Sequence, residues 1–292
     1  MSITFPFAQG QATVLNVGHL QARLSDWLPL SPSELQQPAL RAYQANYDRL
    51  LHLPLQVLVV QLPDITILAD PMRYADLLGT EFAISGYEPP PALDEQLASI
   101  GVAPTTVEHV IISHAHFDHF GAVLDPAGGL QFPNARHYLG AADWEAAAIQ
   151  RALRDPTSLA ATTLGRLRAG GLLELVRVDQ RLAPGIELWL TPGESDGHLV
   201  LRLADGEETL FYLGDLIHHP LEAARPDIVP PWSEPQLVQS RQRVFAAATA
   251  SRARLIATHI AGIGQLAQTE TGYRWFSAKP SVETSAIDPR AT

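Results

Sequence analysis

The sequence predicts an α/β protein that folds as a single domain over residues 1–292. Strand-like and helical segments alternate along the chain, and a pair of strand-like segments ends in an aspartate twice, at Asp70 and at Asp215. This recurrence suggests two related strand-rich halves. With 292 residues, 46% of them hydrophobic, the chain can bury a core of two or more layers. No long Pro-, Gly- or Ser-rich linker divides the sequence, which favours one domain.

The first part of the chain favours a strand, then a helical segment, then two further strands. Residues 12–24 are rich in aliphatic and β-branched side chains, which predicts a strand or a hairpin. An N-terminal helical insertion is predicted at about 31–54, because apolar side chains recur at helical spacing (Leu40, Tyr43, Tyr47, Leu50 and Leu51). We expect the insertion to cover the core, with a substrate lid as the alternative. Residues 55–62 and 65–70 predict two strands joined by a tight turn.

The remaining elements continue the alternation. In chain order, we expect a helix at 90–102, a buried strand at 107–112, a short strand and a helix within 135–154, at least three strands within 181–215, an amphipathic helix at 233–251 and a strand at 254–259. Ser233 is the expected N-cap of the last helix, since a Ser before an apolar repeat is typical of a helix start.

Composition excludes several classes of partner. The net charge is −11 and the 20 Lys and Arg residues are scattered, so the chain lacks the basic patch of a nucleic-acid-binding protein. No apolar run reaches the roughly 18–20 residues of a membrane span, and the N-terminus lacks a signal-peptide pattern, so no membrane contact and a cytoplasmic location are expected. Because the chain has no cysteine, any metal must be bound by nitrogen and oxygen ligands.

The segment Ile-Ser-His-Ala-His-Phe-Asp-His-Phe-Gly, residues 112–121, concentrates metal-ligand side chains directly after a predicted buried strand. His114 and His116 are two positions apart at the end of a strand, so they point the same way and can reach one ion. Asp118 and His119 follow the turn and aim at a neighbouring point. The spacing therefore suits two metal ions.

Three more residues of ligand type stand at predicted strand ends. His198 lies directly before a strand, Asp215 directly after one, and His259 at the end of another. Taken singly, a histidine such as His198 or His259 is more often a hydrogen-bonded structural residue. Together with the 112–121 segment, however, they form a set that can converge at one rim of a sheet, which favours a metal-ligand role.

The pattern from about residue 55 to 264 resembles that of the metallo-β-lactamase-fold hydrolases. His-Ala-His-Phe-Asp-His, Thr-Pro-Gly-Glu-Ser-Asp-Gly-His, Leu-Gly-Asp and Ala-Thr-His stand here in the order of that family, preceded by Ile-Leu-Ala-Asp-Pro. The resemblance implies a four-layer αββα sandwich with a dinuclear centre on its edge. It implies one metal held by His114, His116 and His198, a second held by Asp118, His119 and His259, Asp215 bridging both, and Asp70 orienting a ligand imidazole. One departure is Glu194, which stands where members often carry a non-ligand His, so the contacts around the metals are in question there.

Within this family, the closest resemblance is to the N-acyl-homoserine lactonases and the methyl-parathion-hydrolase-like enzymes. His116 stands where flavodiiron proteins carry Glu, and too few residues follow His259 for the helical domain of glyoxalase II-type thioesterases. Antibiotic-hydrolysing zinc enzymes are exported and lack a carboxylate at the bridging position, which Asp215 supplies here. Nucleases of this fold carry additional basic regions, and the net charge of −11 argues against this class.

The resemblance implies hydrolysis of an uncharged ester by a hydroxide that bridges two divalent metal ions. Zinc is the expected metal, with manganese, iron and cobalt as alternatives. A lactone of the acyl-homoserine type is the first choice of substrate. The alternatives are phosphotriester or aryl-ester hydrolysis and a non-catalytic metal-binding module. A homodimer is an assembly to be tested.

Asp118 is the expected proton shuttle. His218 stands where small lactonases commonly carry a Tyr that contacts the substrate, and is predicted to line the pocket as a donor or acid, the alternative being that His218 or His219 caps a loop carbonyl.

Overall fold

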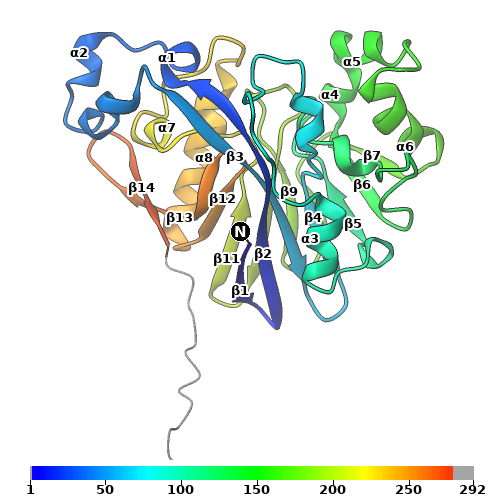
Figure 1. Cartoon of the computed structure of the whole chain (residues 1–292). Coiled ribbons are helices and arrows are strands. Elements are labelled where there is room, and N and C mark those ends of the chain that lie inside the picture. The colour runs from blue at the N-terminus through cyan, green and yellow to red at the C-terminus, as the bar shows by residue number, and fades with distance from the viewer. Residues whose placement is uncertain (1, 279–292) are drawn as a thin grey trace, which may run out of the picture.

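The structure is a computed structural model that describes residues 2–278, so residue 1 and residues 279–292 of the predicted domain lie outside it. The described chain contains two seven-stranded sheets (Figure 1). The first sheet follows chain order and consists of β1 (Ile3–Phe7), β2 (Gly10–Arg23), β3 (Leu50–Gln61), β4 (Thr66–Ala69), β5 (His109–Ile111), β6 (Arg136–Gly140) and β7 (Leu173–Val176). Strands β1 to β4 pair antiparallel, whereas β4 to β7 pair parallel.

The second sheet also keeps chain order. It consists of β8 (Gln180–Ala183), β9 (Ile186–Leu190), β10 (Leu199–Asp205), β11 (Glu208–Tyr212), β12 (Arg254–Ala257), β13 (Ile260–Gln268) and β14 (Tyr273–Ser277). Its pairs are antiparallel except for β11 with β12, which are parallel and are connected through two helices. The two halves suggested by the aspartate-ending strand pairs thus correspond to two sheets of similar size.

Short helices connect the strands. The α-helices are α1 (Leu24–Trp27), α2 (Pro32–Leu35), α3 (Leu93–Ser99), α4 (Ala141–Glu145), α5 (Ala147–Ala152), α6 (Arg166–Ala169), α7 (Pro220–Ala224) and α8 (Gln236–Ala250). The remaining turns of helix are η1 (Arg41–Asn46), η2 (Tyr74–Leu77), η3 (Pro104–Thr106), η4 (Gly121–Val123) and the π-helical η5 (Ala161–Gly165). No helix among the described residues is long and apolar enough to cross a membrane.

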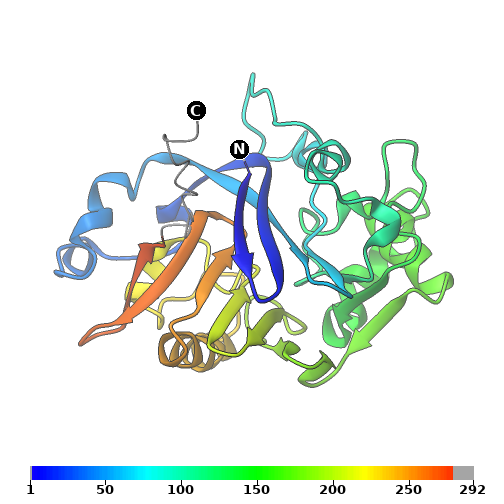
Figure 2. The same cartoon turned by 90° about the horizontal axis from the view of Figure 1, so that it is seen from below.

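Three apolar clusters separate four layers of secondary structure. Side chains alternate along the strands: Leu58 and Val60 of β3 enter the cluster between the sheets, while Val57 and Val59 face the cluster on the outer side. In the second sheet, Phe211 packs in a third cluster with residues of α8. Figure 1 shows α3 to α6 on one side of the strands and α7 and α8 on the other, and Figure 2 shows the β1–β2 hairpin in the middle of the molecule. This period-two burial on both faces of two sheets gives the expected αββα sandwich.

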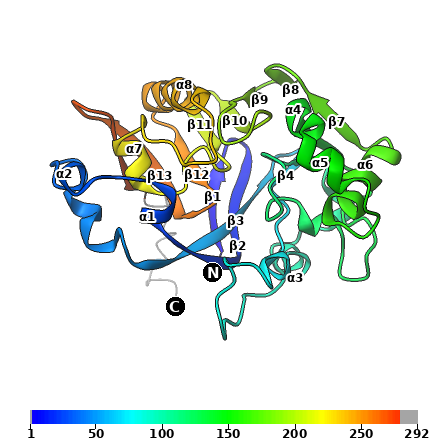
Figure 3. The same cartoon turned by 90° about the horizontal axis from the view of Figure 1, so that it is seen from above.

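Several strand ends meet at one edge of the sandwich, which Figure 3 views from above. Because β4 and β5 are parallel, the segments that follow their carboxyl ends emerge on the same side. The same holds for β11 and β12 in the second sheet. The segments that follow these strands therefore lie at the same edge; they begin at Asp70, Ile112, Leu213 and Thr258.

Two sequence predictions are corrected by the structure. The helical insertion predicted at about 31–54 is helical only in α2 and η1, and β3 already begins at Leu50, because Leu50 and Leu51 pair with Arg23 and Ala22 of β2. Ser233 does not cap the helix predicted at 233–251. That helix is α8, which begins at Gln236, has Pro235 at its N-cap and receives no side-chain cap.

Candidate metal centre

The segment His114–His119 follows the carboxyl end of β5 and folds back in a tight turn. The amide N–H of His119 donates to the carbonyl of His116 across 3.1 Å, which closes the turn and brings the four ligand-type side chains onto one side. The start of the segment is anchored by Ser113, whose N–H and hydroxyl both donate to the Asp70 carboxylate at 2.7 Å. Local hydrogen bonds therefore fix the cluster before any ligand binds.

Asp215 lies in the middle of the histidines. Its Oδ2 is 3.2 Å from Nε2 of His119, 3.3 Å from Nε2 of His259 and 3.8 Å from Nε2 of His114. Gly214 makes this approach possible: it has a φ of +54°, and a Cβ there would lie 2.9 Å from Nε2 of His198. One carboxylate thus contacts imidazoles from both sheets.

Asp118 and His116 add further ligand atoms to the cluster. Oδ2 of Asp118 lies 3.6 Å from Nε2 of His119 and 3.8 Å from Nε2 of His259. Nδ1 of His116 lies 2.8 Å from Nε2 of His114. The side-chain ligand atoms therefore fall into groups within 4.8 Å of one another, one containing His114, His119 and Asp215 and another containing Asp118, His119 and His259.

His198 is close to the cluster but points differently. Its ring centroid lies 5.4 Å from that of His114, and its Nδ1 is 2.8 Å from the hydroxyl of Thr191. Its Nε2 accepts a hydrogen bond from the backbone N–H of Asp215 at 3.2 Å and lies in none of the four groups of converging ligand atoms found among the described residues. Of the seven predicted ligands, His198 is therefore the one whose ligand atom does not converge with the others.

Asp70 is buried beneath the cluster and joins the two sheets. Its Oδ2 lies 2.7 Å from Nδ1 of His119 and accepts a hydrogen bond from the hydroxyl of Tyr212 at 3.0 Å. The residue has a φ of +53°, a left-handed conformation that Asp and Asn tolerate better than most side chains. This contact to the Nδ1 of His119 would leave Nε2 of the same ring free to face Asp215.

The imidazoles of the cluster differ in their protonation behaviour. Burial lowers the pKa of His198 to about 3 and that of His114 well below its ordinary value, so both rings are neutral and keep a lone pair near neutral pH. Burial also opposes charge on His119, but the carboxylates of Asp215 and Asp118 outweigh it and raise its pKa well above the ordinary value. A positive charge is thus favoured at the point where three carboxylates surround His119.

Two further polar networks support the site and could not be recognised from the sequence. The Asp143 carboxylate accepts hydrogen bonds from the N–H of Ala115 at 2.8 Å and of Gly197 at 2.7 Å, which ties the two histidine-bearing segments together. The Glu222 carboxylate accepts from the N–H of His218 at 2.7 Å and forms an ion pair with Arg241, both side chains being fully buried. Neither carboxylate stands in a motif, so the sequence offered no signal.

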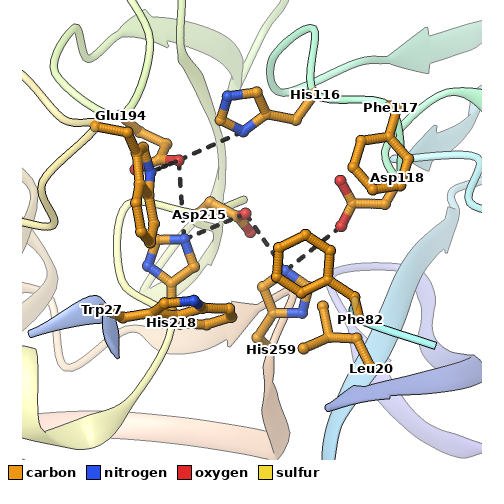
Figure 4. Close-up of a pocket in the computed structure, with 11 residues that line it drawn as sticks. Leu20, Trp27, Phe82, His116, Phe117, Asp118, Glu194, Asp215, His218 and His259 are labelled. Atoms are coloured by element: carbon orange, nitrogen blue, oxygen red, sulfur yellow. Dashed lines mark hydrogen bonds and ion pairs between the residues drawn. The ribbon is translucent and has the colours of Figure 1, made fainter. Parts of the chain in front are cut away.

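A pocket of about 250 Å³ opens above the cluster. Its polar floor contains the predicted Asp118, Asp215, His116, His259 and His218 together with Glu194, which Figure 4 shows pointing toward one another. Its walls are apolar and come from Leu20, Trp27, Phe82, Phe117 and Trp232. The sequence predictions missed these aromatic residues, because they lie in separate segments with no common pattern.

His218 lines this pocket, as the sequence predicted, and His219 has a different role. Nε2 of His218 lies 3.4 Å from Oδ2 of Asp215, and its ring stacks on that of His259 with centroids 5.8 Å apart. His219 instead caps α7, where its Nδ1 accepts a hydrogen bond from the N–H of Leu221. The two neighbouring histidines therefore serve different parts of the structure.

Comparison with known families agrees with this geometry. Residues 85–257 match the family described as the metallo-β-lactamase superfamily. The chain belongs to this superfamily. The match covers the His114–His119 segment, His198 and Asp215, and the sandwich described above is the metallo-β-lactamase fold.

Solved structures and a curated protein show similar chains. A complex of AidC, described as a dizinc quorum-quenching lactonase, covers 95% of this chain and 97% of its own at 21% identity, with a TM-score of 0.74. The hydrolase AbOPH of the β-lactamase superfamily has the same coverages at 18% identity, with a TM-score of 0.77. An N-acyl homoserine lactonase of Bacillus cereus is 29% identical over 117 residues, which are 40% of this chain and 41% of that protein. The matched region thus spans well under half of that lactonase.

Proposed function

We propose that this chain is a metal-dependent hydrolase of uncharged esters, with a lactone of the acyl-homoserine type as its first substrate. The observation that supports this most is the pocket itself, which places imidazoles and carboxylates on its floor beneath apolar, aromatic walls. Such a pocket suits a neutral substrate with a polar reacting group and an apolar tail. The lactonases among the similar chains support the same choice.

The donor set fits two divalent metal ions. Nε2 of His119 and Oδ1 of Asp215 are buried and have no hydrogen-bond partner among residues 2–278, which is costly unless a ligand binds them. We propose the ligand set that the family pattern implies: His114, His116 and His198 for one ion, Asp118, His119 and His259 for the other, and Asp215 for both. His198 would need a small rotation to join the first group, because its Nε2 now accepts from the Asp215 amide. Zinc is the proposed metal. When bound, such ions supply an activated water and polarise a carbonyl oxygen.

The chain's own residues would orient the substrate and move the proton. Asp118 lies on the floor of the pocket and is placed to carry a proton to the leaving oxygen. His218 lies 3.4 Å from Asp215, and its Nε2 can donate a hydrogen bond to a substrate oxygen there. The aromatic walls would bind the acyl group and exclude water. No observation of the site favours a phosphotriester over a carboxylic ester.

The test combines metal analysis with a substrate panel. Protein purified without chelator should contain about two transition-metal ions per chain and should hydrolyse acyl-homoserine lactones faster than aryl esters or a paraoxon-type phosphotriester. Asp118→Asn should greatly reduce turnover, whereas Asp125→Asn, which changes an Asp outside the pocket, serves as the matched control. Protein that carries two metal ions and hydrolyses none of these substrates would refute the proposal, and preferential hydrolysis of the phosphotriester would replace the substrate class.

A further inference from the structure

Glu194 is a buried carboxylate that the ligand set does not use. Only 3% of the residue is exposed, and its Oε1 lies 3.5 Å from Nδ1 of His116 and 3.8 Å from Nε2 of His218 (Figure 4). Within residues 2–278, no arginine or lysine side chain pairs with it. A carboxylate in such a place needs hydrogen-bond donors to offset the loss of water.

Two side chains of one neighbouring loop supply these donors. The indole N–H of Trp232 donates to Oε1 of Glu194 at 2.8 Å, and the hydroxyl of Ser233 donates to Oε2 at 2.9 Å. The loop is also tied by its backbone, since the N–H of Glu234 donates to the carbonyl of Gly193 at 2.7 Å. Ser233 therefore holds Glu194 instead of capping α8.

Trp232 is the most exposed residue of the pocket wall. It is 43% exposed, and it contacts other rings only edge-on, with centroids 5.8 Å from Trp27 and 5.9 Å from His218. An exposed indole with few contacts can adopt several rotamers unless a hydrogen bond selects one. The Glu194 carboxylate is the acceptor that the indole N–H has in this structure.

We propose that Glu194 is a positioning residue that fixes the Trp232 indole in the pocket wall. The pair thereby sets which acyl groups the pocket accepts, and favours lactones and esters whose apolar acyl chain packs against the contiguous surface of Trp27 and Trp232. This specificity rests on the hydrolase function proposed above. The link between Glu194 and Trp232 does not rest on it, because the hydrogen bond exists without substrate.

The first arm of the test measures Trp232 directly. The difference in emission between the protein and its Trp232→Phe variant isolates this indole from the other four tryptophans. In Glu194→Ala the Trp232 signal should shift to longer wavelength and become more accessible to acrylamide, whereas Glu194→Gln, which keeps an acceptor oxygen, should stay close to the parent. The matched control is Glu187→Ala, because Glu187 accepts from the indole of Trp189 at 2.9 Å outside the pocket. In that variant the Trp232 signal should not change.

The second arm measures specificity with acyl-homoserine lactones of short and long acyl chain. Glu194→Ala should raise KM for the long-chain lactone about tenfold, a loss of roughly 1.4 kcal/mol of binding, and should affect the short-chain lactone less. In the Trp232→Phe background, which lacks the N–H donor, adding Glu194→Ala should change KM little, because the two residues act as a unit.

The outcomes separate this inference from the proposed function. Unchanged Trp232 emission in Glu194→Ala would overturn the inference, and so would a loss of bound metal in Glu194→Gln, since Glu194 would then be a metal ligand. Equal KM changes for both chain lengths would overturn the specificity role. If the protein hydrolyses no lactone or ester, the proposed function fails, and the emission arm still decides whether Glu194 positions Trp232.

Discussion

The fully buried ion pair of Arg241 and Glu222 should make a large contribution to stability, which Arg241→Met would remove. Arg241 on α8 donates through Nε to the carbonyl of Leu216 at 2.8 Å and through Nη1 to that of Ile228 at 2.5 Å, and pairs with Glu222. Removing the cation leaves a carboxylate with 0% exposure whose remaining ionisable partner among the described residues is His218, with Nδ1 3.6 Å from Oε1 of Glu222. Loss of one member of a buried pair costs about 3–5 kcal/mol. This is a large fraction of a typical folding free energy of about 5–15 kcal/mol.

The assay is equilibrium unfolding in urea at two pH values. With a slope of about 3 kcal/mol per molar, the midpoint of Arg241→Met should fall by about 1 M or more. Burial raises the pKa of Glu222, but Arg241 together with the contacts from His218 outweighs it and holds the pKa at about 2. Without Arg241 the folded-state pKa should rise above the unfolded value, so the destabilisation is greatest at pH 7.5 and shrinks as the pH falls toward 5 and Glu222 takes up a proton.

Two further variants control this experiment. Arg243→Met, two residues further along the same helix, removes a half-exposed ion pair with Asp179 and should cost less than about 1 kcal/mol. The double variant Glu222→Gln with Arg241→Met removes both charges and should be more stable than Arg241→Met alone. If the midpoint of Arg241→Met shifts no further than that of Arg243→Met, the reasoning about the buried pair is wrong.

Three other predictions concern histidines and the central carboxylate. His218→Ala should keep both metals and lower kcat/KM by roughly 10²-fold, while the exposed His52→Ala serves as its control; wild-type kinetics would make His218 structural. Asp215→Ala should lose bound metal, measured by elemental analysis, yet still unfold cooperatively, and retention of two metals would exclude a bridging role. His137 is buried with a pKa lowered to about 4, so its protonation favours the unfolded state and stability should fall as pH drops from about 6.5 to 4. His137→Leu should remove up to about 3 kcal/mol of that pH dependence, and an unchanged slope would contradict the assignment.

Most strands, and the positions of ligand-type residues at strand ends, could be predicted from the sequence because both depend on short-range patterns. Residues of ligand type directly after apolar runs, such as Asp70 after β4 and Asp215 after β11, must lie at strand ends whatever the rest of the chain does. The parallel pairing of these strands then brings them to one edge. The two halves were suggested because a strand pair ends in an aspartate twice, at Asp70 and at Asp215, and each of these pairs lies in a different sheet.

The errors arose where long-range contacts decide the local structure. Leu50 and Leu51 fit a helical repeat, but pairing with β2 over many residues extends β3 through them. Ser233 has the composition of an N-cap, but its hydroxyl is used by Glu194, 39 positions away in sequence. The residues of the pocket walls could not be predicted for the same reason, because Trp27, Phe82 and Trp232 come together only after folding.

The floor and the walls of the pocket have separate origins in the chain, and this makes the protein a favourable starting point for directed evolution. The floor residues follow strand ends within a hydrogen-bonded edge, where substitutions would disturb several partners at once. The walls come from β2, α1 and connecting loops, and Leu20, Trp27 and Phe82 approach the pocket from outside that edge. Libraries at Phe82 and Trp232, which are more exposed than the buried Leu20 and Trp27, should alter substrate range while most clones still fold, so that selection changes the acyl-group preference without disturbing the polar floor.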